Sequence, residues 1–148
     1  MSRGTLCVVL FVVGALAFGC KKNEEGAAGG GGGGGQTLAS FQAGPDYAAL
    51  MTAAGDAARL IAEDKCADAV PKAKEALALI LKLVPDYGAI GDAAKSDKAL
   101  SDRMSELNAA RATLEMGLEG YEEDPASDLA KIHCNGIADS LAKVTGSP

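Results

Sequence analysis

Only a few side chains of this 148-residue sequence could take part in catalysis or ligand binding. His133 is the single histidine, and Cys134 follows it directly. Cys66 and Met51 lie far upstream. Histidine and cysteine are common zinc ligands, and a histidine with a methionine can hold haem iron. Either site requires elements that bring distant residues together, so the predicted secondary structure decides whether it can form.

The strong periodic signals in residues 45–145 are helical. A first helix is predicted from Pro45 to about Glu63–Lys65, since proline fits the first helical turn. Its apolar face contains Tyr47, Leu50, Met51, Ala54, Ala58 and Ile61. A second helix is predicted from Asp68, with Pro71 in its first turn, as far as Pro85. Its seam contains Val70, Ala73, Leu77, Ile80 and Val84.

The second half of the sequence predicts a short helix or turn over residues 86–94 and then two longer helices. The first of these is opened by Ser96 and carries the seam Leu100, Met104, Leu107, Arg111, Leu114, Leu118 and Tyr121. The acidic residues 122–124 are interpreted as a solvated turn, because an EF-hand would need spaced oxygen ligands and a glycine. Asp124 and Pro125 are predicted to begin the last helix, which ends at Gly146. We therefore predict an all-α fold, a small up-down bundle of about four helices in residues 45–148.

The N-terminal residues indicate where the protein resides. Arg3 precedes an apolar run from Leu6 to Phe18, which is too short to span a bilayer as a helix and is typical of a secretory signal peptide. The run ends in Ala17-Phe18-Gly19-Cys20. This tetrapeptide resembles the lipobox of bacterial lipoproteins. The resemblance implies removal of residues 1–19, lipidation of Cys20 and attachment to the cell envelope through that lipid. The alternative is an ordinary cleaved signal with a chance cysteine.

Two further features of the N-terminal region refine this expectation. Lys21, and not aspartate, follows the cysteine, which by analogy with lipoproteins favours the outer membrane over the inner membrane. Residues 20–44 are predicted to be a tether, because residues 29–35 are seven consecutive glycines. Within it, Gln36 to Gln42, with Leu38 and Phe41, are expected to dock weakly on the domain.

Cys66 and Cys134 remain once Cys20 is assigned to the anchor and Cys7 is removed with the signal peptide. An even pair in an exported protein favours a disulfide, although two unpaired thiols are the alternative. The predicted helix lengths place both cysteines at the same level of the bundle. Such a bridge would close a large loop and stabilise the fold by roughly 4 kcal/mol.

The same helix lengths argue against a metal or haem site. Met51 and His133 are similar to the ligand pair of periplasmic haem-binding four-helix bundles, but Met51 lies about 22 Å below Cys66 along the bundle. A zinc site from His133, Cys134 and Cys66 is also disfavoured, since adjacent helical residues diverge by about 100°. Met51 and His133 therefore remain weak candidates for haem ligands, and His133 remains a weak candidate for a metal ligand. We predict no cofactor.

Charge and composition narrow the function further. Without residues 1–19 the chain has 13 basic and 20 acidic residues, a net charge of −7. No basic cluster is available to neutralise phosphates, so nucleic-acid binding is not expected. No serine–histidine–acid arrangement is evident, so the protein is not predicted to be an enzyme. We predict an envelope lipoprotein with a non-catalytic helical interaction or structural domain that could bind an envelope protein. The alternative is a small haem or metal carrier that uses His133.

Overall fold

The computed structural model of the chain describes residues 36–146, and every regular element among them is an α-helix. The helices are α1 (Leu38–Gln42), α2 (Pro45–Ala62), α3 (Cys66–Leu83), α4 (Tyr87–Ser96), α5 (Lys98–Glu123) and α6 (Leu129–Thr145). The prediction of an all-α fold is confirmed. The predicted signal peptide, Cys20 and most of the predicted tether lie outside the described residues.

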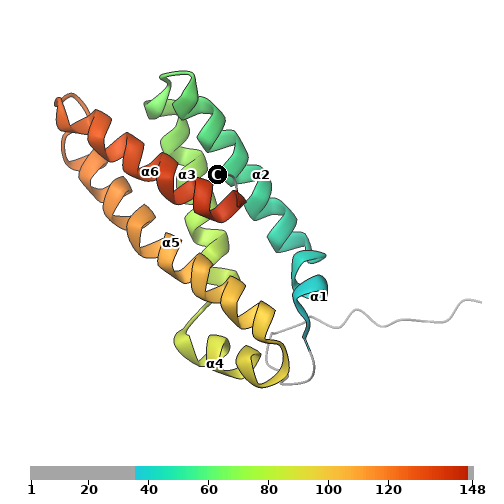
Figure 1. Ribbon diagram of the computed structural model, residues 1–148. Helices are drawn as coiled ribbons and strands as arrows, with labels where there is room; N and C mark the ends of the chain where they lie inside the picture. The colour runs from blue at the N-terminus through green and yellow to red at the C-terminus, as the bar shows by residue number, and fades with distance from the viewer. Residues whose placement is uncertain (1–35, 147–148) are drawn as a thin grey trace, which may run out of the picture. The chain divides into compact units, whose positions relative to one another are not determined.

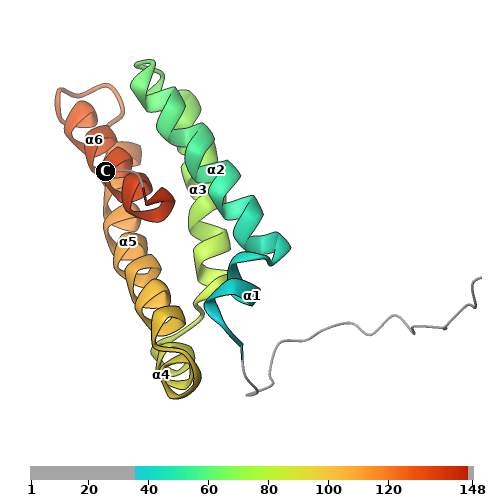
Figure 2. The same ribbon diagram turned by 45° about the vertical axis from the view of Figure 1, so that its right-hand side comes forward.

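The four longest helices alternate in direction along a common axis, as Figures 1 and 2 show. Helix α2 packs against α3 and α6, and α5 packs against α3 and α6. Helices α2 and α5 therefore lie diagonally across the bundle, as do α3 and α6. Helix α4 connects α3 to α5 at the end where α1 also lies (Figure 1). This arrangement is the up-down bundle that short connections favour.

The core combines large aliphatic side chains from all four long helices with many alanines. The fully buried large side chains include Leu50, Ile80, Leu100, Leu107, Leu114, Ile137 and Leu141. Between α2 and α3 the buried residues are mostly small: Ala53, Ala54, Ala57, Ala69, Ala73 and Ala76. Alanines let two helices approach closely, but each buries little apolar area. The fold therefore depends on additional connections between its helices.

Several boundaries differ from the sequence-based predictions. Ser96 was predicted to open the long helix, but it is the last residue of α4, and the carboxylate of Asp97 caps α5 instead. The predicted tether reaches Gly44, but residues 38–42 form α1, and Phe41 is buried. Helix α3 begins at Cys66 and not at Asp68, because the chain reverses within residues 63–65, where Asp64 has a φ of 57°. Pro71 therefore lies in the second turn of α3 and not in the first.

The last helix also begins later than predicted. Asp124 and Pro125 were expected to open it, but α6 starts at Leu129. The reason is local hydrogen bonding: the backbone N–H and the hydroxyl of Ser127 both donate to the carbonyl oxygen of Asp124. This bonding makes residues 124–127 a turn. Glu122 and Glu123, expected in that turn, are instead the last residues of α5.

A polar and aromatic cluster closes the bundle where α1 lies. The carboxylate of Asp97 caps α5 and also accepts a 2.8 Å hydrogen bond from the backbone N–H of Leu38 in α1. Arg103 donates from Nε to the hydroxyl of Tyr47 at 3.1 Å, and its Nη2 donates to the carbonyl of Val144 in the last turn of α6. Phe41 packs edge-on against Tyr47. These contacts join α1, α2, α5 and α6.

Candidate functional site

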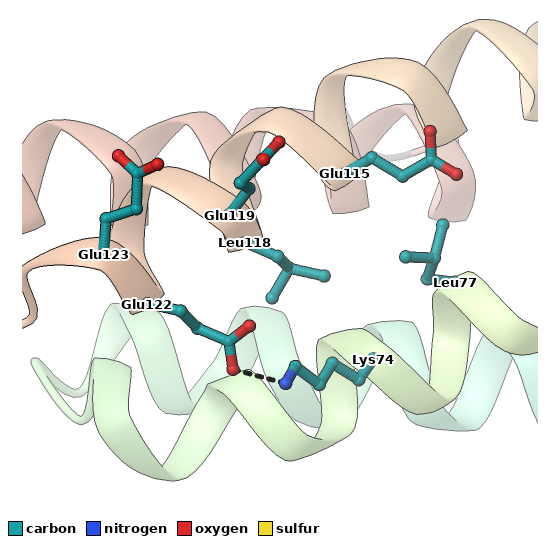
Figure 3. A pocket seen from close by; sticks show the side chains of 7 residues that line it. All are labelled: Lys74, Leu77, Glu115, Leu118, Glu119, Glu122 and Glu123. Carbon is teal, nitrogen blue, oxygen red and sulfur yellow. Dashed lines mark hydrogen bonds and ion pairs between the residues drawn. The ribbon is translucent and has the colours of Figure 1, made fainter.

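An open groove lies on the surface of the described residues between α3 and α5. Its volume is about 570 Å³. The groove, shown in Figure 3, is lined by Lys74, Leu77, Glu115, Leu118, Glu119, Glu122 and Glu123. We refer to it below as the α3/α5 groove.

The helical repeat explains why these residues share one surface. On α5, residues 115, 118 and 122 and residues 115, 119 and 123 follow one another at steps of three or four positions. They fall on the side that faces α3 or borders it. On α3, Lys74 and Leu77 are three positions apart. Leu118 is buried and Leu77 is half-buried against the core, and both extend into the space between the helices (Figure 3). The groove therefore has an apolar floor and a charged rim.

The rim is strongly asymmetric in charge. Four carboxylates come from α5 and one ammonium group from α3. Lys74 forms an ion pair with Glu122, the interaction drawn as a dashed line in Figure 3. Among residues 36–146, Glu119 and Glu123 have no cationic partner within ion-pair distance. The wall of the groove formed by α5 thus carries an excess of negative charge.

Arg111 lies one turn before Glu115 on the same side of α5. Its Nε is 3.6 Å from a carboxylate oxygen of Glu115, and its side chain is 26% exposed. Arg111, the one charged member of the predicted seam, therefore has an acidic neighbour on its own helix. Its Nε is buried and makes no hydrogen bond within the described residues. The pair offsets part of the charge at one end of the groove and leaves the opposite end, near Glu119 and Glu123, acidic.

The predicted cysteine pair is a disulfide. The sulfur atoms of Cys66 and Cys134 are 1.99 Å apart, and the Cα atoms are 6.1 Å apart. The prediction of this bond is confirmed. Since both sulfurs are bonded, neither provides the thiolate that nucleophilic attack or metal binding would need.

His133 packs against α5. Its imidazole lies over Gly120, where a Cβ atom would be 2.3 Å from Cε1 of the ring. Met51 is in the middle of α2, eleven residues or about 16 Å before the end of that helix. His133 is next to the disulfide that reaches the start of α3, beyond that end. The two residues are therefore not brought together.

The described residues also contain no cluster suited to a metal ion: nowhere in 36–146 do three His, Cys, Asp or Glu side chains converge. None of the helices in this range has both the length and the apolar character of a membrane span. Comparisons of the chain with protein-family models, with curated proteins and with solved structures give no match.

Sequence reasoning missed two features of this region. The first is the pair Gly117 and Gly120, where α6 approaches α5 so closely that a Cβ on Gly117 would lie 2.9 Å from Cγ1 of Ile137. Their three-residue spacing within a long helix was the available signal. The second is the α3/α5 groove. Its acidic residues could be read from the sequence, but the neighbour they face could not.

Proposed function

We propose that this chain is a lipid-anchored protein of the bacterial cell envelope whose helical domain is a non-catalytic binding module. The anchor rests on the lipobox-like residues that end in Cys20. The observation that carries the binding role is the α3/α5 groove, because an apolar floor with a charged rim is a common composition for a recognition surface. The lipid on Cys20 would hold the module at a membrane surface, where it would meet its partner, and Lys21 favours the outer membrane over the inner membrane for this site.

The alternative of a haem or metal carrier has no observation in its favour. Its central residue, His133, packs on Gly120, and its proposed companions are remote or joined in the disulfide. The binding module is therefore the proposal that we develop.

The anchor is tested in cells that carry the full-length chain. We expect a clickable palmitate analogue to label the protein and the protein to sediment with membranes after a high-salt wash. Cys20→Ser should abolish the labelling and release the protein. Cys7→Ser, a matched change within the predicted signal peptide, should leave both unchanged. Labelling that persists in Cys20→Ser would overturn the anchor.

The binding role is tested by photo-crosslinking in intact cells. Benzoylphenylalanine is placed in turn at the exposed positions Thr52, Ala78, Ala112 and Asn135, one on each long helix. We expect at least one position to give a discrete adduct with an envelope protein. A complete lack of adducts at all four positions would contradict the proposal.

A further inference from the structure

We propose that the α3/α5 groove binds a cationic amphipathic segment of a partner protein. Apolar side chains of that segment would rest on the half-buried Leu77, with the buried Leu118 below it. Its lysine or arginine side chains would pair with Glu119 and Glu123. This inference rests on the proposed binding function and names the chemistry of the partner.

The floor of the groove favours an apolar side chain. Leu77 is half-buried and provides the accessible part of the floor, whereas Leu118 is only 4% exposed and belongs to the core below it. A volume of about 570 Å³ is within the range of sites that hold ligands of a few hundred daltons. It is thus large enough for several side chains of a peptide. The burial of such side chains on the exposed part of Leu77 would supply binding free energy that does not depend on charge.

The charged rim of the groove favours a partner with positive charge. Glu115 and Glu122 already have cationic neighbours in Arg111 and Lys74, but Glu119 and Glu123 do not. A partner with positive charges around an apolar anchor would provide ion-pair partners for these two carboxylates. An anionic partner would meet repulsion here and from the net charge of −6 of the whole chain.

Lys74 indicates where a cation of the partner can lie. It projects from α3 and pairs with Glu122 of α5 beside the apolar floor (Figure 3). Its ammonium group therefore occupies the type of position that a lysine of the partner would take. Removing this charge frees Glu122 and should increase the affinity for a cationic segment, whereas removing the unpaired carboxylates should decrease it.

The probe is a labelled hexapeptide of alternating lysine and leucine. Its binding to the full-length chain in nanodiscs of zwitterionic lipid is followed by fluorescence anisotropy, with empty nanodiscs as the blank. We expect E119Q/E123Q to weaken binding about fivefold and Lys74→Gln to strengthen it about twofold, typical of exposed ion pairs. The controls D92N/D139N and Lys95→Gln make the same changes in net charge away from the groove and should alter binding much less.

Two altered peptides separate the contributions of floor and rim. Replacing the leucines with serine, or the lysines with glutamine, should each abolish most of the binding. Equal effects of the groove variants and their controls would overturn the inference, since binding would then follow net charge alone. Displacement of the peptide by equimolar spermidine would also overturn it in favour of a free polyamine. A dimer that E119Q/E123Q converts to monomers would assign the groove to a second copy.

Failure of the peptide experiment and failure of the proposed function are distinguishable. If crosslinking finds an envelope protein on another helix face while the peptide does not bind, the binding module stands and the groove inference is wrong. If no face gives an adduct, the binding module itself is wrong, whatever the affinity of the peptide.

Discussion

The two ends of the bundle are held together by different chemistry. At one end the disulfide joins α3 to α6, and at the other Arg103 joins α5 to α2 through Tyr47. Each connection thus links one diagonal pair of helices, the pairs that pack least on one another. One link is covalent and independent of pH, whereas the other depends on charge and hydrogen bonds. A core rich in alanine leaves both diagonals in need of such a link.

The largest effect is expected at the covalent end. The double variant C66A/C134A should lose about 4 kcal/mol of unfolding free energy, because the bond closes a loop with a sequence separation of 68. Urea unfolding followed by circular dichroism measures this change. Wild-type protein unfolded in reductant is the matched control and should have the same stability as the variant. Equal stability of oxidised and reduced protein would show that the bond is not a major contributor.

The next effect tests the end held by Arg103. Arg103→Met should cost about 2–3 kcal/mol, since it removes charge-assisted hydrogen bonds from a side chain that is only 12% exposed. Arg59→Met is the control, because the side chain of Arg59 is 59% exposed and pairs only with nearby acids. Its effect should stay within about 0.5 kcal/mol.

Combining these variants asks whether the two ends are independent. The effects of Arg103→Met and C66A/C134A should add to within about 0.5 kcal/mol, because the sites lie at opposite ends and share no contact. A larger coupling would mean that the diagonal links act together through the core, and the comparison between the ends would then fail.

A third variant examines the packing that accompanies the disulfide. Gly117→Ala should destabilise the protein by about 1–3 kcal/mol, since its Cβ would be 2.9 Å from Ile137 and would force α5 and α6 apart. Gly55→Ala, at a helical site where the added Cβ would meet nothing within 4 Å beyond its chain neighbours and its own helix backbone, should instead stabilise it by up to about 1 kcal/mol. Thermal unfolding of both variants gives the comparison. If Gly117→Ala also stabilised the protein, α6 would be able to move away from α5 without loss of stability.

The same contrast explains how much the sequence could predict. Helical periodicity predicted the all-α fold, and the number of cysteines predicted the disulfide. The links at the other end were not predictable, because no spacing pattern relates Arg103 to Tyr47 or Asp97 to Leu38. They depend on which helices become neighbours.

Local competition accounts for the wrong boundaries. Asp124 and Pro125 are good residues for a helix start, but Ser127 hydrogen bonds to Asp124 and forms a turn there instead. The candidate site could likewise be predicted only in part. Glu119 and Glu123 could be placed on one side of a helix, yet the leucine floor beside them required the packing of α3 on α5.

The smallest predicted effect is a pH dependence confined to the end without the disulfide. The backbone N–H groups of Leu38 and Leu100 donate to Asp97 and lower the pKa of its carboxyl below the usual 3.8. A carboxyl with a lowered pKa in the folded state stabilises that state above its unfolded pKa, and this contribution is lost as the pH falls through the folded pKa.

We therefore expect α1 to loosen below pH about 4, seen as faster amide exchange at Leu38, while amides beside the disulfide stay protected. Asp97→Asn should flatten this dependence. Asp92→Asn should not, although the pKa of Asp92 is also lowered, because its partner is Lys95 and not α1. Equal acid loosening at both ends would show that the link through Asp97 does not distinguish them.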